Sequence, residues 1–152
     1  MQKKYFLSCQ AEINNIVRDI IALGKDNAVF VLSGELGSGK TTLTRHLVNE
    51  IDKSIKINSP TFLINKNYFL ANKPYRIVHY DLYRLSKYQE LLEIGFEEAI
   101  RDKNWVFIEW PEKIPELMTN IKQINKNKKI ILIQIFHIDY KNKRKITLNY
   151  EK

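Results

Sequence analysis

Hydrophobic residues recur along the chain with two different periods, and the longer period predicts two amphipathic helices. The first is expected between residues 10 and 23, where one face is apolar at i, i+3, i+4, i+7 and i+8. This stripe consists of Ile13, Ile16, Val17, Ile20 and Ile21. Gly24 follows as a helix stop. The second stripe consists of Leu43, Leu47, Val48 and Ile51.

Short apolar runs predict strands. Residues 28–32 (AVFVL) and 105–108 (WVFI) are too short for helices and lack polar alternation, which is typical of strands buried on both faces of a parallel sheet. Weaker strand signals lie at 61–69, 75–80, 130–138 and 146–150. The first two flank a turn at 71–74, as in a hairpin.

The remaining segments complete an α/β pattern. A helix interrupted at Gly95 is expected over 87–100, and the Lys/Asn-rich segment 120–129 is expected to be a solvated connection. Strands mixed with helices predict a mixed central β-sheet flanked by helices. A length of 152 residues fits one domain, so we expect a single α/β domain over 1–152.

One motif lies between the first buried strand and the second helix. Residues 34–41 (GELGSGKT) match G-x-x-x-x-G-K-[ST] in full. Glycines let the backbone bring its N–H groups against phosphate oxygens, and the helix N-terminus adds partial positive charge. Lys40 is expected to reach the β- and γ-phosphates, and the Thr41 hydroxyl to bind Mg²⁺. The sequence therefore predicts a P-loop NTPase-like domain that binds a nucleoside triphosphate.

Two acidic residues end predicted strands. Glu109 closes the strand 105–108 and is expected either to ligate Mg²⁺ or to act as a general base on water. Asp81 closes the strand 75–80 and could orient the attacking water, hold a metal-bound water, or simply cap a turn. His79 is interpreted as an ordinary strand side chain. The Ser-Pro-Thr segment ending at Thr61 resembles a switch that senses the γ-phosphate.

Composition leaves the choice of partner open. The charge is +8, from 25 Lys+Arg and 17 Asp+Glu, which is consistent with a polyanionic partner or with the compositional drift of an AT-rich genome. The single cysteine, Cys9, excludes an internal disulfide and fits a reducing compartment. No apolar run of about 18 residues or signal-peptide core is present, so we expect a cytoplasmic protein with no membrane partner.

These motifs occur together in one order. They are GELGSGKTT at 34–42, SPTF at 59–62, HYDLYRL at 79–85, GFEEA at 95–99 and EWP at 109–111. In this combination the chain resembles the TsaE family, also called YjeE, over nearly its whole length. The resemblance implies a small bacterial Mg²⁺-dependent ATPase that supports threonylcarbamoyladenosine formation in tRNA. It also implies association with a TsaB–TsaD pair that stimulates a weak ATPase. ATP hydrolysis would reset the complex between turnovers, and the chain would contact tRNA only indirectly, through that complex.

The resemblance also implies roles for individual residues. The residues that surround the nucleotide phosphates are Gly34, Gly37, Ser38, Gly39, Lys40, Thr41 and Thr42. Thr41 and Glu109 hold Mg²⁺, Asp81 lies beside the γ-phosphate, and Thr61 belongs to the switch-like loop. Trp110 neighbours the acid at the partner-facing end. Arg144 and Glu12 are expected near the nucleotide base, although the family often has a small hydroxyl residue where this chain has Glu12.

Two other functions compete with this interpretation. A small P-loop kinase needs a lid and a second substrate pocket, and only Arg84 and Arg101 lie in the segment from Asp81 to Glu109 where an Arg-rich lid would be expected. A basic RNA-binding module with a structural nucleotide would use a different set of residues. Its patch would consist of Lys122, Lys126, Lys128, Lys129 and the cations between 141 and 145.

Overall fold

The computed structural model describes residues 1–7, 12–24, 28–71, 73–138 and 143–150. Its strands are β1 (Gln2–Leu7), β2 (Ala28–Ser33), β3 (Asn65–Phe69), β4 (Arg76–Asp81), β5 (Trp105–Glu109), β6 (Lys129–His137) and β7 (Arg144–Tyr150). Its α-helices are α1 (Ile13–Gly24), α2 (Lys40–Ile51), α3 (Tyr88–Leu92), α4 (Phe96–Arg101) and α5 (Leu117–Ile124). Cys9 lies outside the described residues.

All seven strands form one mixed sheet in the order β1-β7-β6-β2-β5-β4-β3. The four central strands run parallel, because β2 pairs in parallel with both β5 and β6, and β5 pairs in parallel with β4. Both edges are antiparallel, through β3 on β4 and through β7 and β1 beyond β6. The carboxyl ends of β2, β5 and β4 therefore meet at one end of the sheet, where ligands bind in open α/β sheets.

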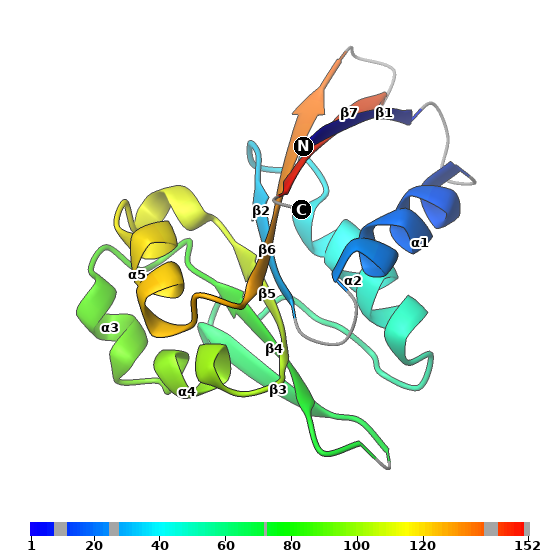
Figure 1. Ribbon diagram of the computed structural model, residues 1–152. Helices are drawn as coiled ribbons and strands as arrows, with labels where there is room; N and C mark the ends of the chain where they lie inside the picture. Colours follow the sequence, from blue (N-terminus) through cyan, green and yellow to red (C-terminus); the bar gives the residue numbers. More distant parts are fainter. Residues whose placement is uncertain (8–11, 25–27, 72, 139–142, 151–152) are drawn as a thin grey trace.

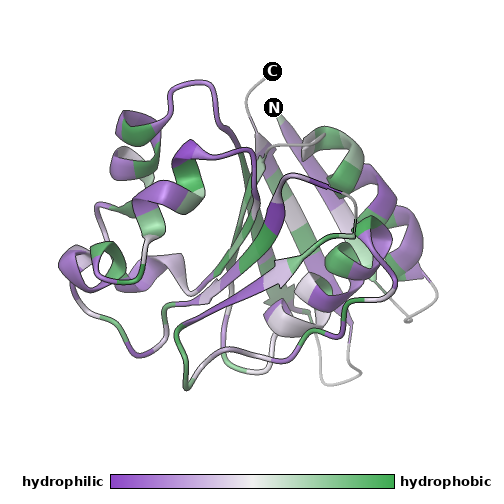
Figure 2. Cartoon of the chain, turned by 90° about the horizontal axis from the view of Figure 1, so that it is seen from below, coloured by the Kyte–Doolittle hydropathy of each residue, from purple (hydrophilic) through white to green (hydrophobic). Residues whose placement is uncertain are grey.

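Helices cover the sheet on both sides, with α1 and α2 on one face and α3, α4 and α5 on the other (Figure 1). Alternate residues of β2 enter different cores, as the period of a strand requires. Phe30 and Leu32 pack towards α1 and α2, whereas Val29 and Val31 pack towards the other three helices. Each helix in Figure 2 carries both green and purple positions, as expected for elements that bury one face. The predicted α/β fold with a mixed sheet flanked by helices is confirmed.

Several predicted elements are corrected. The segment 120–129 is not only a solvated connection, because its first half belongs to α5, which buries Leu117 and Ile121. The strand expected at 61–69 begins only at Asn65, because the chain turns after Pro60 and Ile64 has a φ of 65°. The interruption predicted at Gly95 within 87–100 is confirmed, since Gly95 adopts a left-handed conformation between two separate helices. The sequence interpretation missed β1 altogether.

No described helix is long and apolar enough to cross a membrane.

Candidate functional site

The P-loop connects β2, at the centre of the sheet, to α2. Gly34, Gly37 and Gly39 have φ values of 150°, 75° and 105°, which side chains with a Cβ rarely adopt. Gly34 is also sterically confined, because an added Cβ would lie 2.5 Å from the Ile135 carbonyl oxygen of β6. Ser38 is buried in the loop, while Thr42 is exposed in the first turn of α2. The loop thus has the backbone conformation that only its glycines allow.

Lys40, the first residue of α2, points its amine back into the loop. Its Nζ donates to the carbonyl oxygens of Gly34 at 2.7 Å and Glu35 at 3.0 Å. The same Nζ lies 3.5 Å from the centroid of the Trp110 ring. Burial lowers the pKa of Lys40, and the nearby carboxylates, led by Glu109, oppose that shift. The amine is therefore held at the mouth of the P-loop by carbonyl groups and an aromatic ring.

Glu109 is the centre of a buried polar network. Its side chain is 1% exposed. Thr41 Oγ1 donates to Oε2 at 2.7 Å, and Thr44 Oγ1 donates to Oε1 at 3.2 Å. His79 Nε2 lies 2.8 Å from Oε1. These contacts fix the carboxylate against the first turn of the helix that follows the P-loop.

His79 is fully buried, and its two ring nitrogens differ in environment. Nε2 contacts Glu109, while Nδ1 has no hydrogen-bond partner within the described parts of the chain. Because the Glu109 carboxylate can only accept, Nε2 is the donor in this contact. His79 is a strand side chain, as predicted, and it also orients the acid on the neighbouring strand.

Asp81 lies directly beside Glu109, because the two residues are paired in register between β4 and β5. Its Oδ2 accepts hydrogen bonds from the hydroxyls of Ser59, at 3.1 Å, and Thr61. Its Oδ1 accepts from the backbone N–H of Tyr83 at 3.1 Å. The structure thus brings the Ser-Pro-Thr segment and the acid at the end of β4 together.

The two residues expected near the nucleotide base lie in different settings. Arg144 begins β7, and its Nε donates to the Ser38 carbonyl oxygen at 3.1 Å, which places the guanidinium against the P-loop. Glu12 is exposed immediately before α1. Contact of either residue with a base stays a prediction.

Sequence reasoning missed two members of the site. Thr44 lies one helical turn after Thr41, so its hydroxyl faces the same acid, and the i, i+3 spacing was the available signal. The bond from His79 to Glu109 was also missed. Its signal was the two-residue spacing from Asp81, which puts both side chains on one face of β4.

The arrangement offers oxygen ligands to a hard cation. Thr41 Oγ1 and Glu109 Oε2 are 2.7 Å apart at the helix N-terminus. Among the described residues no group of three or more His, Cys, Asp or Glu could hold a metal ion. Mg²⁺ keeps several waters and takes one or two protein ligands together with phosphate oxygens, and Thr41 and Glu109 could supply such ligands.

Known proteins resemble this chain in sequence and in fold. The profile described as "Threonylcarbamoyl adenosine biosynthesis protein TsaE" matches residues 7–146. A protein from Rickettsia typhi is 35% identical over 135 residues, which cover 84% of this chain and 92% of the relative. A Haemophilus influenzae protein is 36% identical over 121 residues, which cover 75% of each chain. Both are named tRNA threonylcarbamoyladenosine biosynthesis protein TsaE.

The fold has a counterpart among solved structures. The crystal structure of Bacillus subtilis YdiB superposes with a TM-score of 0.63 at 24% identity, covering 97% of this chain and 84% of that one. The likeness agrees with a P-loop NTPase-like fold. The profile match over most of the sequence and the two relatives show that the chain belongs to the TsaE family.

Proposed function

We propose that the protein is a Mg²⁺-dependent ATPase that acts with a TsaB–TsaD pair in the biosynthesis of threonylcarbamoyladenosine in tRNA. One observation carries the proposal: the P-loop lysine and two carboxylates on adjacent strands, Glu109 and Asp81, meet at the same end of the sheet. The tRNA pathway comes from the names of the relatives.

Lys40 and the loop amides bind the triphosphate. The Lys40 amine donates to two carbonyls of its own loop, which carry no full negative charge. Phosphate oxygens are stronger acceptors than carbonyls because they carry charge. The amine therefore exchanges the carbonyls for the β- and γ-phosphates, and the burial that lowers its pKa in the free protein is offset by the bound anion.

Thr41 and Glu109 hold the metal ion. When bound there, Mg²⁺ would supply positive charge that offsets the negative charge developing on the phosphates. The hydrogen bonds from Thr44 and His79 to Oε1 keep the carboxylate oriented while its other oxygen, Oε2, faces Thr41. Such supporting contacts orient metal ligands in many proteins.

Asp81 orients the water that attacks the γ-phosphate. It lies one strand beyond Glu109, on the side of the Ser59–Thr61 segment. The hydroxyls of Ser59 and Thr61 hold its Oδ2, and the Tyr83 N–H holds Oδ1. Because the same segment contacts Asp81, its movement on γ-phosphate binding would reposition the acid.

A partner completes the site. In related sites an arginine stabilises the charge that develops on the γ-phosphate. Here Arg45 donates to the Ile57 carbonyl and Arg84 lies over the Phe62 ring, so both side chains are held by other contacts. The segments that frame the site expose large apolar side chains, with Leu36 78% exposed and Phe62 82% exposed. Exposed apolar groups of this kind mark interaction sites. The TsaB–TsaD pair is the proposed occupant.

The direct test is ATP turnover with Mg²⁺, measured for the protein alone and with a co-purified TsaB–TsaD pair. We expect slow turnover alone and stimulation by the pair, since groups supplied in trans contribute about 10³–10⁵-fold in related sites. The Lys40→Ala variant with the pair is the control and should show no stimulation. A rate near 10 s⁻¹ for the isolated protein, typical of a complete enzyme, would overturn partner completion.

A further inference from the structure

In the part of the chain that the structure describes, no helix covers one face of the β6–β7–β1 edge. The opposite face packs against α1, through residues such as Ile133, Ile146 and Leu148. On the uncovered side α5 lies beside the start of β6, while β7 and β1 extend beyond the helices (Figure 1). The side chains of this bare face are arranged in rows, because residues paired across neighbouring strands point to the same side.

The outermost row places a lysine between two phenylalanines. Phe6 of β1 and Phe136 of β6 are both paired in register with Lys145 of β7. Phe6 is 64% exposed and Phe136 is 46% exposed, and Lys145 Nζ lies 5.6 Å from the centroid of the Phe136 ring. Two strand spacings separate the rings by about 9–10 Å. Two open aromatic surfaces thus flank one cation.

The second row is polar, and the third row combines two amides with the apolar Leu132. Lys4, Thr147 and Gln134 form the second row across the same strands. The third row contains Gln2 and Asn149, whose side-chain amides are joined by a 3.1 Å hydrogen bond. Each amide carries two donors and one acceptor oxygen, so the pair still has hydrogen-bonding capacity towards a ligand.

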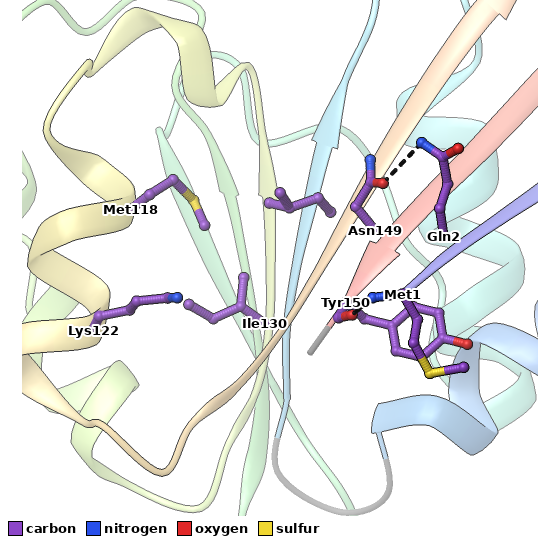
Figure 3. A pocket seen from close by; sticks show the side chains of 8 residues that line it. Met1, Gln2, Met118, Lys122, Ile130, Asn149 and Tyr150 are labelled. Carbon is purple, nitrogen blue, oxygen red and sulfur yellow. Dashed lines mark hydrogen bonds between the residues drawn. The ribbon is translucent and has the colours of Figure 1, made fainter. Parts of the chain in front are cut away.

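The third row opens into a groove of about 510 Å³ between the sheet and α5. Figure 3 shows Met118 and Lys122 of α5 pointing towards Ile130 of β6, with the amide pair of Gln2 and Asn149 across the opening. The groove therefore has apolar walls, a lysine on one side and amides on the other. This combination can accept a flat heterocycle with polar edges.

The charge of this edge has one sign. The sequences of β1, β6 and β7 contain no Asp or Glu. Of their cationic residues, Lys4 and Lys145 lie in the rows of the bare face. Lys3, Lys129 and Arg144 alternate with that face and belong to the side that packs against α1. We propose that this bare face binds an unpaired stretch of RNA, with bases stacked on Phe6 and Phe136, phosphates on Lys4 and Lys145, and one base in the groove beside α5.

The exposed aromatic rings beside cations in these rows favour RNA over an acidic protein segment. Sequence-tolerant stacking on exposed aromatic rings beside cations is the recurrent mode for single-stranded nucleic acid on sheets. The site differs from the lysine patch considered from sequence. Lys128 does not belong to it, because its side chain is buried and its Nζ donates to the Asp102 and Asn104 carbonyls.

The test is fluorescence anisotropy of the full chain with a labelled, unpaired RNA of about 12 nucleotides, a length within the range of known single-strand sites. The Phe6→Ala/Phe136→Ala variant should weaken binding about 30-fold, from about fivefold for each lost stacking contact. Lys4→Gln/Lys145→Gln should lower the slope of log affinity against log salt by about 1.4. The same RNA annealed to its complement should bind weakly.

Matched controls lie on the opposite edge of the sheet. Phe69→Ala removes an aromatic ring that is 78% exposed on β3, and Lys73→Gln removes an exposed lysine from the same hairpin. Both should leave RNA binding unchanged, as should Lys40→Ala, which separates this proposal from the nucleotide site. The proposal is overturned by absent RNA binding, by equal losses in the control variants, or by phenylalanine variants that keep RNA affinity and lose the TsaB–TsaD pair instead.

Discussion

The glycines of the P-loop allow a sharp comparison within one turn. Gly34 and Gly37 both have positive φ values, but their surroundings differ. A Cβ added at Gly34 would lie 2.5 Å from the Ile135 carbonyl oxygen and 2.8 Å from Ser38 Oγ, whereas a Cβ at Gly37 would meet nothing within 4 Å. Gly34→Ala therefore adds a steric clash to backbone strain, and Gly37→Ala adds backbone strain alone.

The expected magnitudes follow from these two terms. An unfavourable φ costs about 1–2 kcal/mol of folding free energy for an alanine. Overpacking against a fixed neighbour costs about 1–3 kcal/mol more, and the neighbour here is the backbone of β6, which is paired on both sides. We expect Gly37→Ala to lower the free energy of unfolding by about 1–2 kcal/mol and Gly34→Ala by about 2–5 kcal/mol.

Urea unfolding followed by circular dichroism measures the difference. With a slope of about 2 kcal/mol/M, Gly34→Ala should unfold about 1 M earlier than Gly37→Ala. Equal midpoints for the two variants would refute the close approach of Gly34 to β6, and with it the seating of the P-loop on the sheet.

Two other predictions concern buried charge and turnover. Burial lowers the pKa of Lys128 to about 8, so between pH 8 and 10 the unfolded chain keeps a proton that the folded chain has released. The free energy of unfolding, measured by urea titration, should therefore rise by about 2 kcal/mol across that interval relative to Lys128→Met. The same dependence of unfolding free energy on pH in both proteins would contradict this. Asp81→Asn should lower partner-stimulated ATP turnover about 10²–10⁴-fold and leave the calorimetric Kd for ATP within about threefold; undiminished turnover would remove Asp81 from the water-orienting role.

The central part of the fold was predictable from sequence because its signals are local. An apolar run, a glycine motif and an amphipathic stripe follow one another directly, and they correspond to β2, the P-loop and α2. The elements that the sequence did not predict correctly have a different origin. The residues of β1 are mostly exposed and two of them are lysines, so pairing with β7 rather than a hydrophobic pattern makes it a strand. In α5 the surrounding Lys and Asn residues obscured a short apolar stripe.

In the candidate site, too, local features were predictable from sequence and contacts between distant residues were not. Sequence could nominate Glu109 and Asp81 because each ends an apolar run, but it could not show that they are paired in register on adjacent strands. The contact of His79 with Glu109, and that of Arg144 with the Ser38 carbonyl, join residues 30 and 106 positions apart. Such contacts depend on strand order, which a single sequence does not encode locally.

The most direct test of the central claim is isothermal titration calorimetry of ATP into the isolated protein with Mg²⁺ present. We predict saturable binding at one site for the natural chain, weaker binding when Mg²⁺ is chelated, and no measurable binding for Lys40→Ala, whose amine lies at the mouth of the P-loop. Tight ATP binding retained by Lys40→Ala would contradict the account.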